Sequence, residues 1–209
     1  MMNVCANCGQ YHADKIIDPS GPFAICPECG YKHSFKQLPL LMVSGASGSG
    51  KTTICQKLLG RCDQVVLMES DILWRPEFNT PETRYRDFFE PWLRIAKNIS
   101  QSGRPVVLFG AGTGVPENIE HLIERRYFSS VRYLELVCSD EALTGRLLSR
   151  PEWRSTTEPA FITAQIEFNH WFKNYSGKPP VTLIDTTDAP IEETTNKVLE
   201  WIEGNLGSS

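Results

Sequence analysis

Short apolar runs recur along the chain from residue 40 onward, and longer stretches of mixed apolar and polar residues separate them. A continuous apolar run of this kind, bounded by turn residues, is typical of a strand buried on both faces. Because the runs alternate with stretches of helical spacing, they predict an α/β fold with a five-stranded parallel sheet and helices on both faces. The predicted strands cover residues 40–44, 64–69, 105–110, 131–138 and 179–185.

Helical spacing is clearest directly after the first run, where residues 52–62 place Ile54 and Leu58 on one face. Pro116 and Ser139 suit the first positions of two later helices, because proline fits a first turn and serine caps free N–H groups. The predicted helices cover residues 52–62, most of 81–103, 116–128, 139–150 and 189–204.

Composition places the chain among ordinary globular proteins. Of its 209 residues, 41% are hydrophobic and 22% are charged, which suits one α/β domain with a small appendage. A net charge of -4 gives no general attraction to nucleic acid or to an acidic membrane. The start of the chain, MMNVCANCGQ, lacks a signal-peptide pattern, and no apolar run reaches transmembrane length. We therefore expect a cytoplasmic protein with no membrane partner, either a monomer or a homodimer.

Two Cys-x-x-Cys knuckles mark the first part of the chain: Cys5 with Cys8, and Cys26 with Cys29. Each knuckle brings two thiolates to one ion, and two knuckles supply the tetrahedral sulfur set that zinc prefers. Disulfides are the alternative, which a reducing compartment disfavours, and a redox pair would require a βαβ pattern that is missing here. The cysteines therefore predict a structural Zn²⁺ ion in a zinc ribbon over residues 1–36, followed by a second domain over 37–209.

The stretch GASGSGKTT, residues 45–53, lies between the first predicted strand and the first predicted helix. It matches the phosphate-binding pattern G-x-x-x-x-G-K-[ST], whose glycines let backbone N–H groups converge on phosphate oxygens. In this pattern Lys51 reaches the β- and γ-phosphates, and the hydroxyl of Thr52 binds Mg²⁺. The alternative is a glycine-rich turn without a ligand. The expected phosphate-binding residues are Gly45, Ala46, Ser47, Gly48, Ser49, Gly50, Lys51, Thr52 and Thr53.

Carboxylates narrow the class of P-loop protein. A GTPase would need Asn-Lys-x-Asp, but NKVLE at 196–200 has leucine in place of the aspartate. A motor-type ATPase would end its third strand in Asp, whereas this chain reads LFGAGTG there. Instead, Glu69 and Asp71 follow the second predicted strand, two residues apart, which places both over the carboxyl ends of the sheet.

With this loop and this acidic pair, the sequence resembles the shikimate kinase, gluconate kinase and chloramphenicol phosphotransferase branch of the nucleoside-monophosphate-kinase-like P-loop phosphotransferases. The resemblance covers roughly residues 39–205. It implies that Glu69, where the family usually has Asp, helps to order Mg²⁺. It implies that Asp71 contacts or deprotonates the acceptor hydroxyl.

Two further stretches carry the resemblance. TGRLLSRPEWR resembles the family's lid, here residues 139–160, which implies that Arg146 and Arg150 close over the phosphates. Taken alone, these arginines would read as a solvated helix face. LIDTTDAP resembles the strand and loop that lie near the adenine in the family.

Residues 72–104 correspond to the family's acceptor-binding helical insert and are rich in aromatic residues and arginines. Aromatic faces with arginines suit a flat base or a ring carrying an anionic group. Trp74 and Arg75 follow Asp71 closely, so we expect these three residues to contact the acceptor. Phe88 and Phe89 are expected to pack the helix onto the sheet instead.

Two functional hypotheses follow. The first is Mg²⁺-dependent transfer of the ATP γ-phosphoryl group to a hydroxyl or phosphate of a small molecule, best a nucleoside or nucleoside monophosphate. Its catalytic residues would be Lys51, Asp71, Arg146 and Arg150. The alternative is a nucleic-acid-binding zinc-ribbon protein with ATPase or RNA-end kinase activity. The three lysines of the ribbon are balanced by three acidic residues, which makes nucleic acid an unlikely partner.

Overall fold

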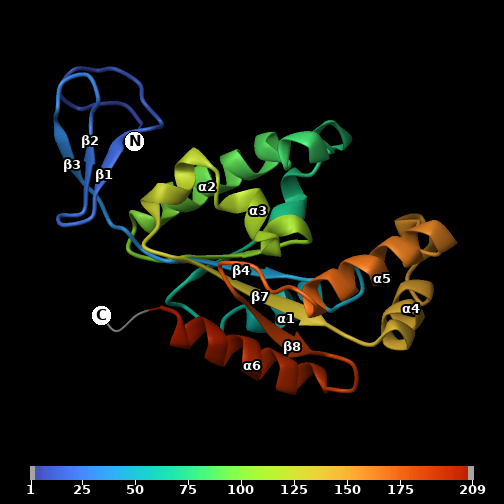
Figure 1. Ribbon diagram of the computed structural model, residues 1–209. Coiled ribbons are helices and arrows are strands. Elements are labelled where there is room, and N and C mark those ends of the chain that lie inside the picture. Colours follow the sequence, from blue (N-terminus) through green and yellow to red (C-terminus); the bar gives the residue numbers. More distant parts are fainter. Residues whose placement is uncertain (1–2, 207–209) are drawn as a thin grey trace.

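A five-stranded parallel sheet forms the centre of the protein in the computed structural model, which describes residues 3–206 (Figure 1). Its order is β5-β6-β4-β7-β8, so the strand that leads into the P-loop lies in the middle. In register, Leu40 lies opposite both Val106 and Val131. All five predicted strands are confirmed: β4 (Leu40–Ser44), β5 (Val66–Glu69), β6 (Val106–Phe109), β7 (Val131–Val137) and β8 (Val181–Asp185).

Helices cover both faces of the sheet, which is why its strands are apolar on both sides (Figure 1). Helices α1 (Lys51–Leu58) and α6 (Ile191–Gly204) pack on one face, where they meet Leu41 and Val43. Helix α2 (Arg86–Ser100) lies on the other face, against Leu40 and Met42, beside the short helix α3 (Pro116–Ile119). Helices α4 (Asp140–Leu148) and α5 (Pro159–Lys173) follow β7.

Helix α5 was not predicted from the sequence. Of its residues only Asn169 and Phe172 are buried, so the chain shows no strong apolar stripe there. Several predicted helices are also shorter than expected, and α1, for example, ends at Leu58 and not at residue 62. Residues 116–128 form α3 and then a 3₁₀ turn, η5 (Ile123–Tyr127), because Leu122 takes an extended conformation between them. Helix α2 begins only at Arg86, because the two residues before it have left-handed backbone conformations.

The N-terminal residues form a separate antiparallel sheet of strands β1 (Ile16–Asp18), β2 (Phe23–Ile25) and β3 (Lys32–Ser34). Each cysteine knuckle ends in a glycine with positive φ, 74° at Gly9 and 69° at Gly30, which permits the tight turn after the second cysteine. This module, residues 3–36, lies beside α2 in Figure 1, far from the ends of the strands that carry the P-loop.

The contact between the N-terminal module and α2 centres on a buried cation. Lys97 of α2 donates from Nζ to Asn3 Oδ1 at 2.6 Å and also pairs with the buried carboxylate of Glu124. The same Nζ lies 4.1 Å from the centre of the Tyr127 ring. The hydroxyl of Tyr127 donates to the carbonyl oxygen of Ala13 at 2.7 Å. The N-terminal module is therefore fixed to the C-terminal end of α2.

No helix within residues 3–206 has both the length and the apolar character needed to cross a bilayer.

Candidate functional site

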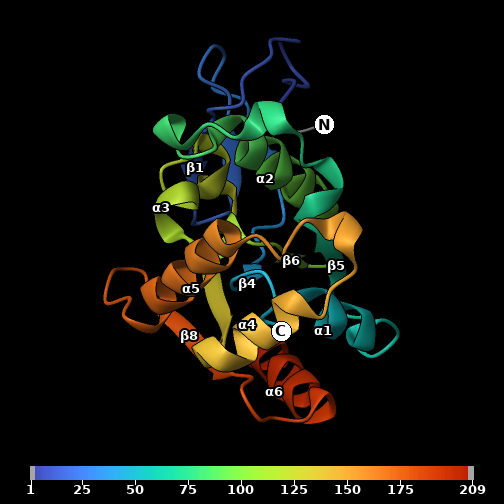
Figure 2. The same cartoon turned by 90° about the vertical axis from the view of Figure 1, so that its right-hand side faces the viewer.

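The P-loop leads directly from β4 into α1 at the carboxyl edge of the sheet, the edge that Figure 2 faces. Gly45 and Gly48 have φ values of 142° and 95°, in the region that favours glycine. Side chains are also excluded by space, because a Cβ on Gly45 would lie 2.4 Å from the carbonyl oxygen of Leu136. These conformations turn the loop around a hollow at the start of α1, where free backbone N–H groups suit an anion.

Lys51 is the first residue of α1, and its side chain folds back over the loop. Its Nζ donates to the carbonyl oxygens of Gly45 at 2.8 Å and Ala46 at 3.0 Å. Burial lowers the pKa of Lys51 to about 8, and the negative charge of nearby Asp71 opposes this shift. Two bonds to neutral carbonyls are weak partners for an ammonium group, so phosphate oxygens would replace them readily.

The two acidic residues lie at the same edge in different settings. Glu69 is the last residue of β5 and is half-buried, whereas Asp71 is exposed in the 3₁₀ turn η1 (Ser70–Leu73). Between them Ser70 is buried against Gly110, where a Cβ would lie 1.9 Å from Ser70 Oγ. The negative charges of Glu69 and Asp71 both raise the pKa of Lys51. Thus the sequence-predicted carboxylates and the P-loop lysine lie in one electrostatic environment.

A cavity of about 370 Å³ opens on one side of the P-loop. It combines the loop, the arginines of α4 and the segment after β8. Arg146 donates to the hydroxyl of Thr186 at 3.0 Å and also to its carbonyl oxygen, and the Thr186 hydroxyl donates to Ser49 O at 3.2 Å. Arg150, two residues beyond α4, lines the same cavity. The structure therefore brings both predicted lid arginines beside the P-loop.

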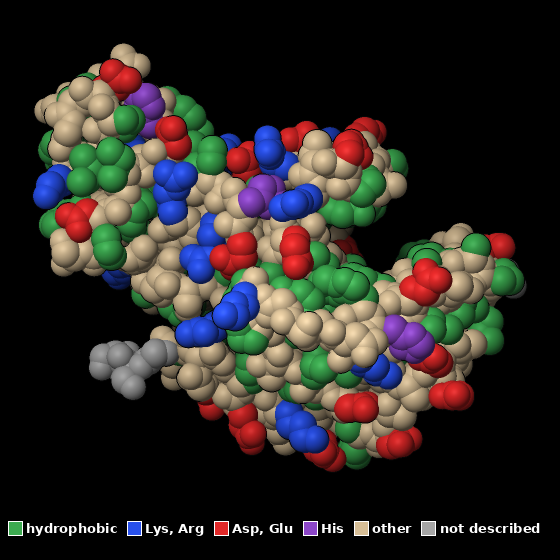
Figure 3. Space-filling model, viewed as in Figure 1, with side chains coloured by type: hydrophobic (Ala, Val, Ile, Leu, Met, Phe, Trp, Pro, Cys, Tyr) green, Lys and Arg blue, Asp and Glu red, His purple; other side chains and the backbone are tan. Residues whose placement is uncertain are grey.

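A second, larger cavity of about 710 Å³ is connected to the P-loop through Gln165. Its walls are the turns after β5 with the start of α2, the loop after β6, and helix α5. Figure 3 shows the molecule hollowed between the first of these walls and α5. Gln165 of α5 lines the cavity and accepts a hydrogen bond from Ser47 N at 2.8 Å, which ties α5 to the P-loop.

Of the three expected acceptor contacts, Asp71 and Trp74 line this larger cavity. Trp74 stands edge-on to Phe88, with ring centres 5.1 Å apart. Arg75 is exposed and precedes Pro76 at the start of the next 3₁₀ turn, and it is not among the described residues that line the cavity. Phe88 was expected only to pack the helix onto the sheet. It is buried against the sheet and also forms part of the cavity wall.

Glu135, in the middle of β7, is a buried carboxyl that we did not single out from the sequence. It lies opposite Ser44 of β4, and neither of its oxygens has a hydrogen-bond partner among the described residues. A Cβ on Gly114 would lie 1.6 Å from Glu135 Oε1, so the loop after β6 needs glycine there. Burial raises the pKa of Glu135 well above its usual value, against the opposing charge of Lys51. The acidic residue within the otherwise apolar stretch YLELV was the signal that could have found it.

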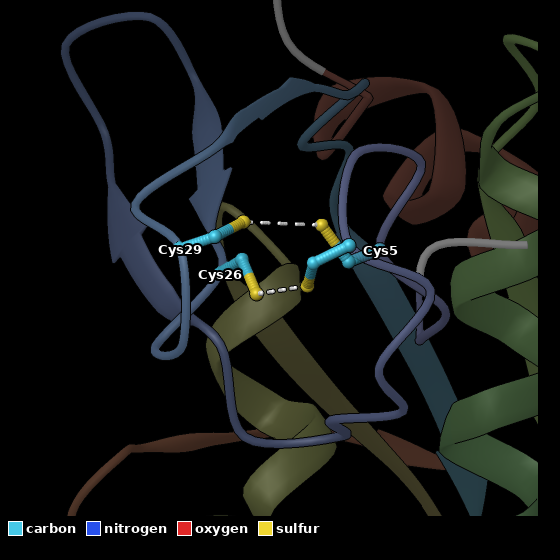
Figure 4. A group of neighbouring side chains, drawn as sticks. Cys5, Cys26 and Cys29 are labelled. Carbon is cyan, nitrogen blue, oxygen red and sulfur yellow. Dashed lines mark hydrogen bonds between the residues drawn. The ribbon is translucent and has the colours of Figure 1, made fainter.

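The four knuckle cysteines converge in the N-terminal module, and all four sulfur atoms lie within 4.8 Å of one another (Figure 4). Cys5 Sγ is 3.6 Å from Cys29 Sγ, and Cys8 Sγ is 3.8 Å from Cys26 Sγ. Four sulfurs held tetrahedrally at about 2.3 Å from zinc would be roughly 3.8 Å apart. The observed spacing therefore fits a Zn²⁺ ion with four sulfur ligands.

The sequence matches no protein family model and no curated protein. The fold is similar to that of a gluconokinase from Sinorhizobium meliloti 1021, at 19% identity and a TM-score of 0.55 over 82% of this chain and 94% of that one. It is similar to that of a thymidylate kinase from Candida albicans, at 14% identity and a TM-score of 0.51 over 81% of this chain and 92% of that one. It is also similar to that of a tunicamycin resistance protein from Deinococcus radiodurans, at 14% identity and a TM-score of 0.57 over 79% of this chain and 96% of that one.

These similarities confirm the fold that the resemblance implied. The chain has the P-loop kinase fold.

Proposed function

We propose that this protein transfers the γ-phosphoryl group of ATP to a hydroxyl or phosphate of a small molecule, with nucleosides and nucleoside monophosphates as the acceptor class. The observation that carries this proposal is the pair of separate cavities beside the P-loop. One contains the predicted lid arginines, and the other contains Asp71. A kinase needs separate donor and acceptor spaces, because the acceptor oxygen and the leaving oxygen of ADP must lie in line on opposite sides of the γ-phosphorus.

The residues around the P-loop suit the donor. Backbone N–H groups of residues 45–53 would hold the phosphates, with Lys51 beside the β- and γ-phosphates. Arg146 and Arg150 would neutralise charge on the transferred group, a task for which planar guanidinium groups are well shaped. Thr186 and the segment after it would lie near the base.

Thr52 and Glu69 would hold Mg²⁺. A hydroxyl and a carboxylate are oxygen donors of the type Mg²⁺ prefers, and Glu69 is close enough to Lys51 to raise its pKa. When bound, Mg²⁺ neutralises charge on the phosphate oxygens. Asp71 would accept or orient the acceptor hydroxyl proton. The acceptor oxygen forms a bond to the γ-phosphorus, the bond between the γ-phosphorus and the β,γ-bridging oxygen breaks, and ADP leaves with that oxygen.

A screen of hydroxyl compounds for acceptor-dependent ADP release tests this proposal. We expect at least one compound to raise ADP release and to gain one phosphoryl group, which mass spectrometry of the acceptor would detect. ATP hydrolysis that no hydroxyl compound stimulates would contradict the proposal and favour a plain ATPase.

The nucleic-acid alternative has less support from the N-terminal module. Lys15 is fully buried, with its Nζ 3.0 Å from His33 Nε2, and Lys32 Nζ lies 3.9 Å from Asp18 Oδ2. Two of the three ribbon lysines therefore already have partners within the module, which weakens any attraction to phosphate backbones.

We also propose that Cys5, Cys8, Cys26 and Cys29 bind one structural Zn²⁺ ion. We expect elemental analysis of protein purified without chelator to find about one zinc per chain. Cys26→Ser should lose the metal and unfold the N-terminal module, because metal binding supplies much of the folding free energy of such modules. Cys138→Ser, at a buried cysteine remote from the knuckles, is the matched control and should keep its zinc. Metal-free protein with an intact N-terminal module would refute the proposal.

A further inference from the structure

The two cavities beside the P-loop differ sharply in charge, and this difference bears on the acceptor. The smaller cavity contains Arg146 and Arg150. In the larger cavity no lysine or arginine occurs among the described lining residues. Asp71 is the carboxylate among those residues. A phosphate or carboxylate entering this space would lose water and meet no cation in the wall. The wall therefore disfavours anionic acceptors.

Aromatic side chains make up much of the same wall. Trp74, Tyr85 and Phe88 come from the turns after β5 and the start of α2, while Phe161 and Phe168 come from α5. The two groups belong to the two lobes on either side of the hollow in Figure 3. Aromatic side chains on two sides of a cavity suit a flat ring, which can stack against them. A volume of about 710 Å³ accommodates a ring with an attached sugar.

Neutral amides supply the polar groups of the cavity. Asn118 donates from Nδ2 to Gly112 O at 3.2 Å, and Gln165 accepts at Oε1 from Ser47 N at 2.8 Å. Each amide is held by one end, so Asn118 offers an acceptor oxygen and Gln165 offers donor hydrogens to a ligand. A third amide, Asn79, lies in the wall beside them. Donors and acceptors without net charge match the edge of a nucleobase.

We propose that the acceptor is an uncharged nucleoside, and that nucleoside monophosphates and sugar acids are poor acceptors. This inference rests on the proposed kinase function and narrows its acceptor class from nucleosides and nucleoside monophosphates to nucleosides alone. The base stacks between the two aromatic walls and bonds to the amides, and a sugar hydroxyl lies at Asp71. That hydroxyl oxygen bonds to the γ-phosphorus of ATP, its proton passes to Asp71 or water, and ADP leaves. The product is a nucleoside monophosphate.

Matched acceptor pairs test the inference directly. Each common nucleoside is compared with its own 5′-monophosphate and 3′-monophosphate, so that one charged acceptor keeps the reacting hydroxyl whichever sugar hydroxyl it is. Gluconate is included as a sugar acid, with kcat/KM as the readout. We expect the best nucleoside to exceed its monophosphate by about a hundredfold or more, the scale of an unpaired buried charge. A preferred monophosphate, or phosphorylation of gluconate alone, would overturn the inference and leave the kinase proposal standing. No stimulation by any acceptor would instead overturn the kinase proposal itself.

A variant that adds a positive charge to the cavity wall tests whether the charge of the wall, and not the shape of the cavity, sets the acceptor preference. Asn79→Lys places a cation in the acceptor wall, and we expect it to narrow the preference for nucleoside over monophosphate by about tenfold. Glu82→Lys is the control, because Glu82 is exposed on the neighbouring turn η3 (Pro81–Thr83) and outside the cavity lining. It should leave the preference unchanged. An equal shift in both variants would mean that long-range charge sets the preference, and the assignment to the wall would be wrong.

Discussion

Replacing Asp71 by Asn is expected to lower acceptor phosphorylation about a hundredfold or more while leaving ATP binding nearly intact, the usual scale for a positioned base. The substitution keeps the size of the side chain and most of its hydrogen bonding but removes its charge and basicity. Asp71 lines the larger cavity, which we propose binds the acceptor, whereas Arg146 and Arg150 line the smaller cavity. The measurements are the rate of acceptor phosphorylation at saturating ATP and the Kd for ATP by calorimetry.

Asp63→Asn is the matched control for this experiment, because Asp63 is exposed in the loop before β5, at the opposite end of that strand. It should behave as the unaltered protein. Phosphoryl transfer can proceed through a loose transition state with little need for a base, so a much smaller loss would indicate that Asp71 mainly positions the acceptor. Loss of ATP binding in Asp71→Asn would instead make Asp71 a metal ligand, and the assigned role would be wrong.

Replacing Lys51 by Ala is expected to weaken ATP binding and to lower turnover by roughly a hundredfold or more, as removal of a group that stabilises transition-state charge does elsewhere. The pKa of Lys51 is lowered to about 8, so the free amine loses its charge as the pH rises through that value. ATP affinity of the unaltered protein should therefore fall as pH rises through about 8.

In Lys51→Ala this fall in affinity should be absent, which separates loss of the charged amine from general damage to the loop. Lys57→Ala removes an exposed lysine from the same helix and serves as the control, with affinity and pH dependence preserved. An unchanged pH profile in Lys51→Ala would show that another group titrates. ATP affinity equal to that of the unaltered protein would contradict the role assigned to Lys51.

The parts of the fold that follow from local pattern were predictable. Each strand is an apolar run bounded by turn residues, and the loop 45–53 carries its own signature between a strand and a helix. Asp71 and Trp74, which line the larger cavity, could be singled out from the sequence because they follow such a strand closely. Helix α5 was missed, because its aromatic residues Phe161 and Phe168 face a cavity and leave no continuous apolar stripe.

Contacts between distant segments were beyond the sequence pattern. Gln165 is tied to Ser47, 118 residues away, and nothing near Gln165 in the sequence indicates that bond. Arg75 is only one residue further from Asp71 in sequence than Trp74, but it precedes the turn at Pro76 and does not line the larger cavity. The lack of charge in the acceptor wall likewise depends on which side chains meet in space, because the segment itself is rich in arginine.

Lys97, which pairs with the buried Glu124, joins the N-terminal module to α2 through its bond to Asn3, and the other end of α2 lines the larger cavity. Removing the module would leave this ion pair and the ring of Tyr127 without their contacts to Asn3 and Ala13. Breaking such buried contacts costs more than forming them contributes, because the groups left behind are incompletely satisfied. The two sheets are thereby energetically coupled, and a metal ion bound to the smaller one would also contribute to the cooperativity with which the whole chain unfolds.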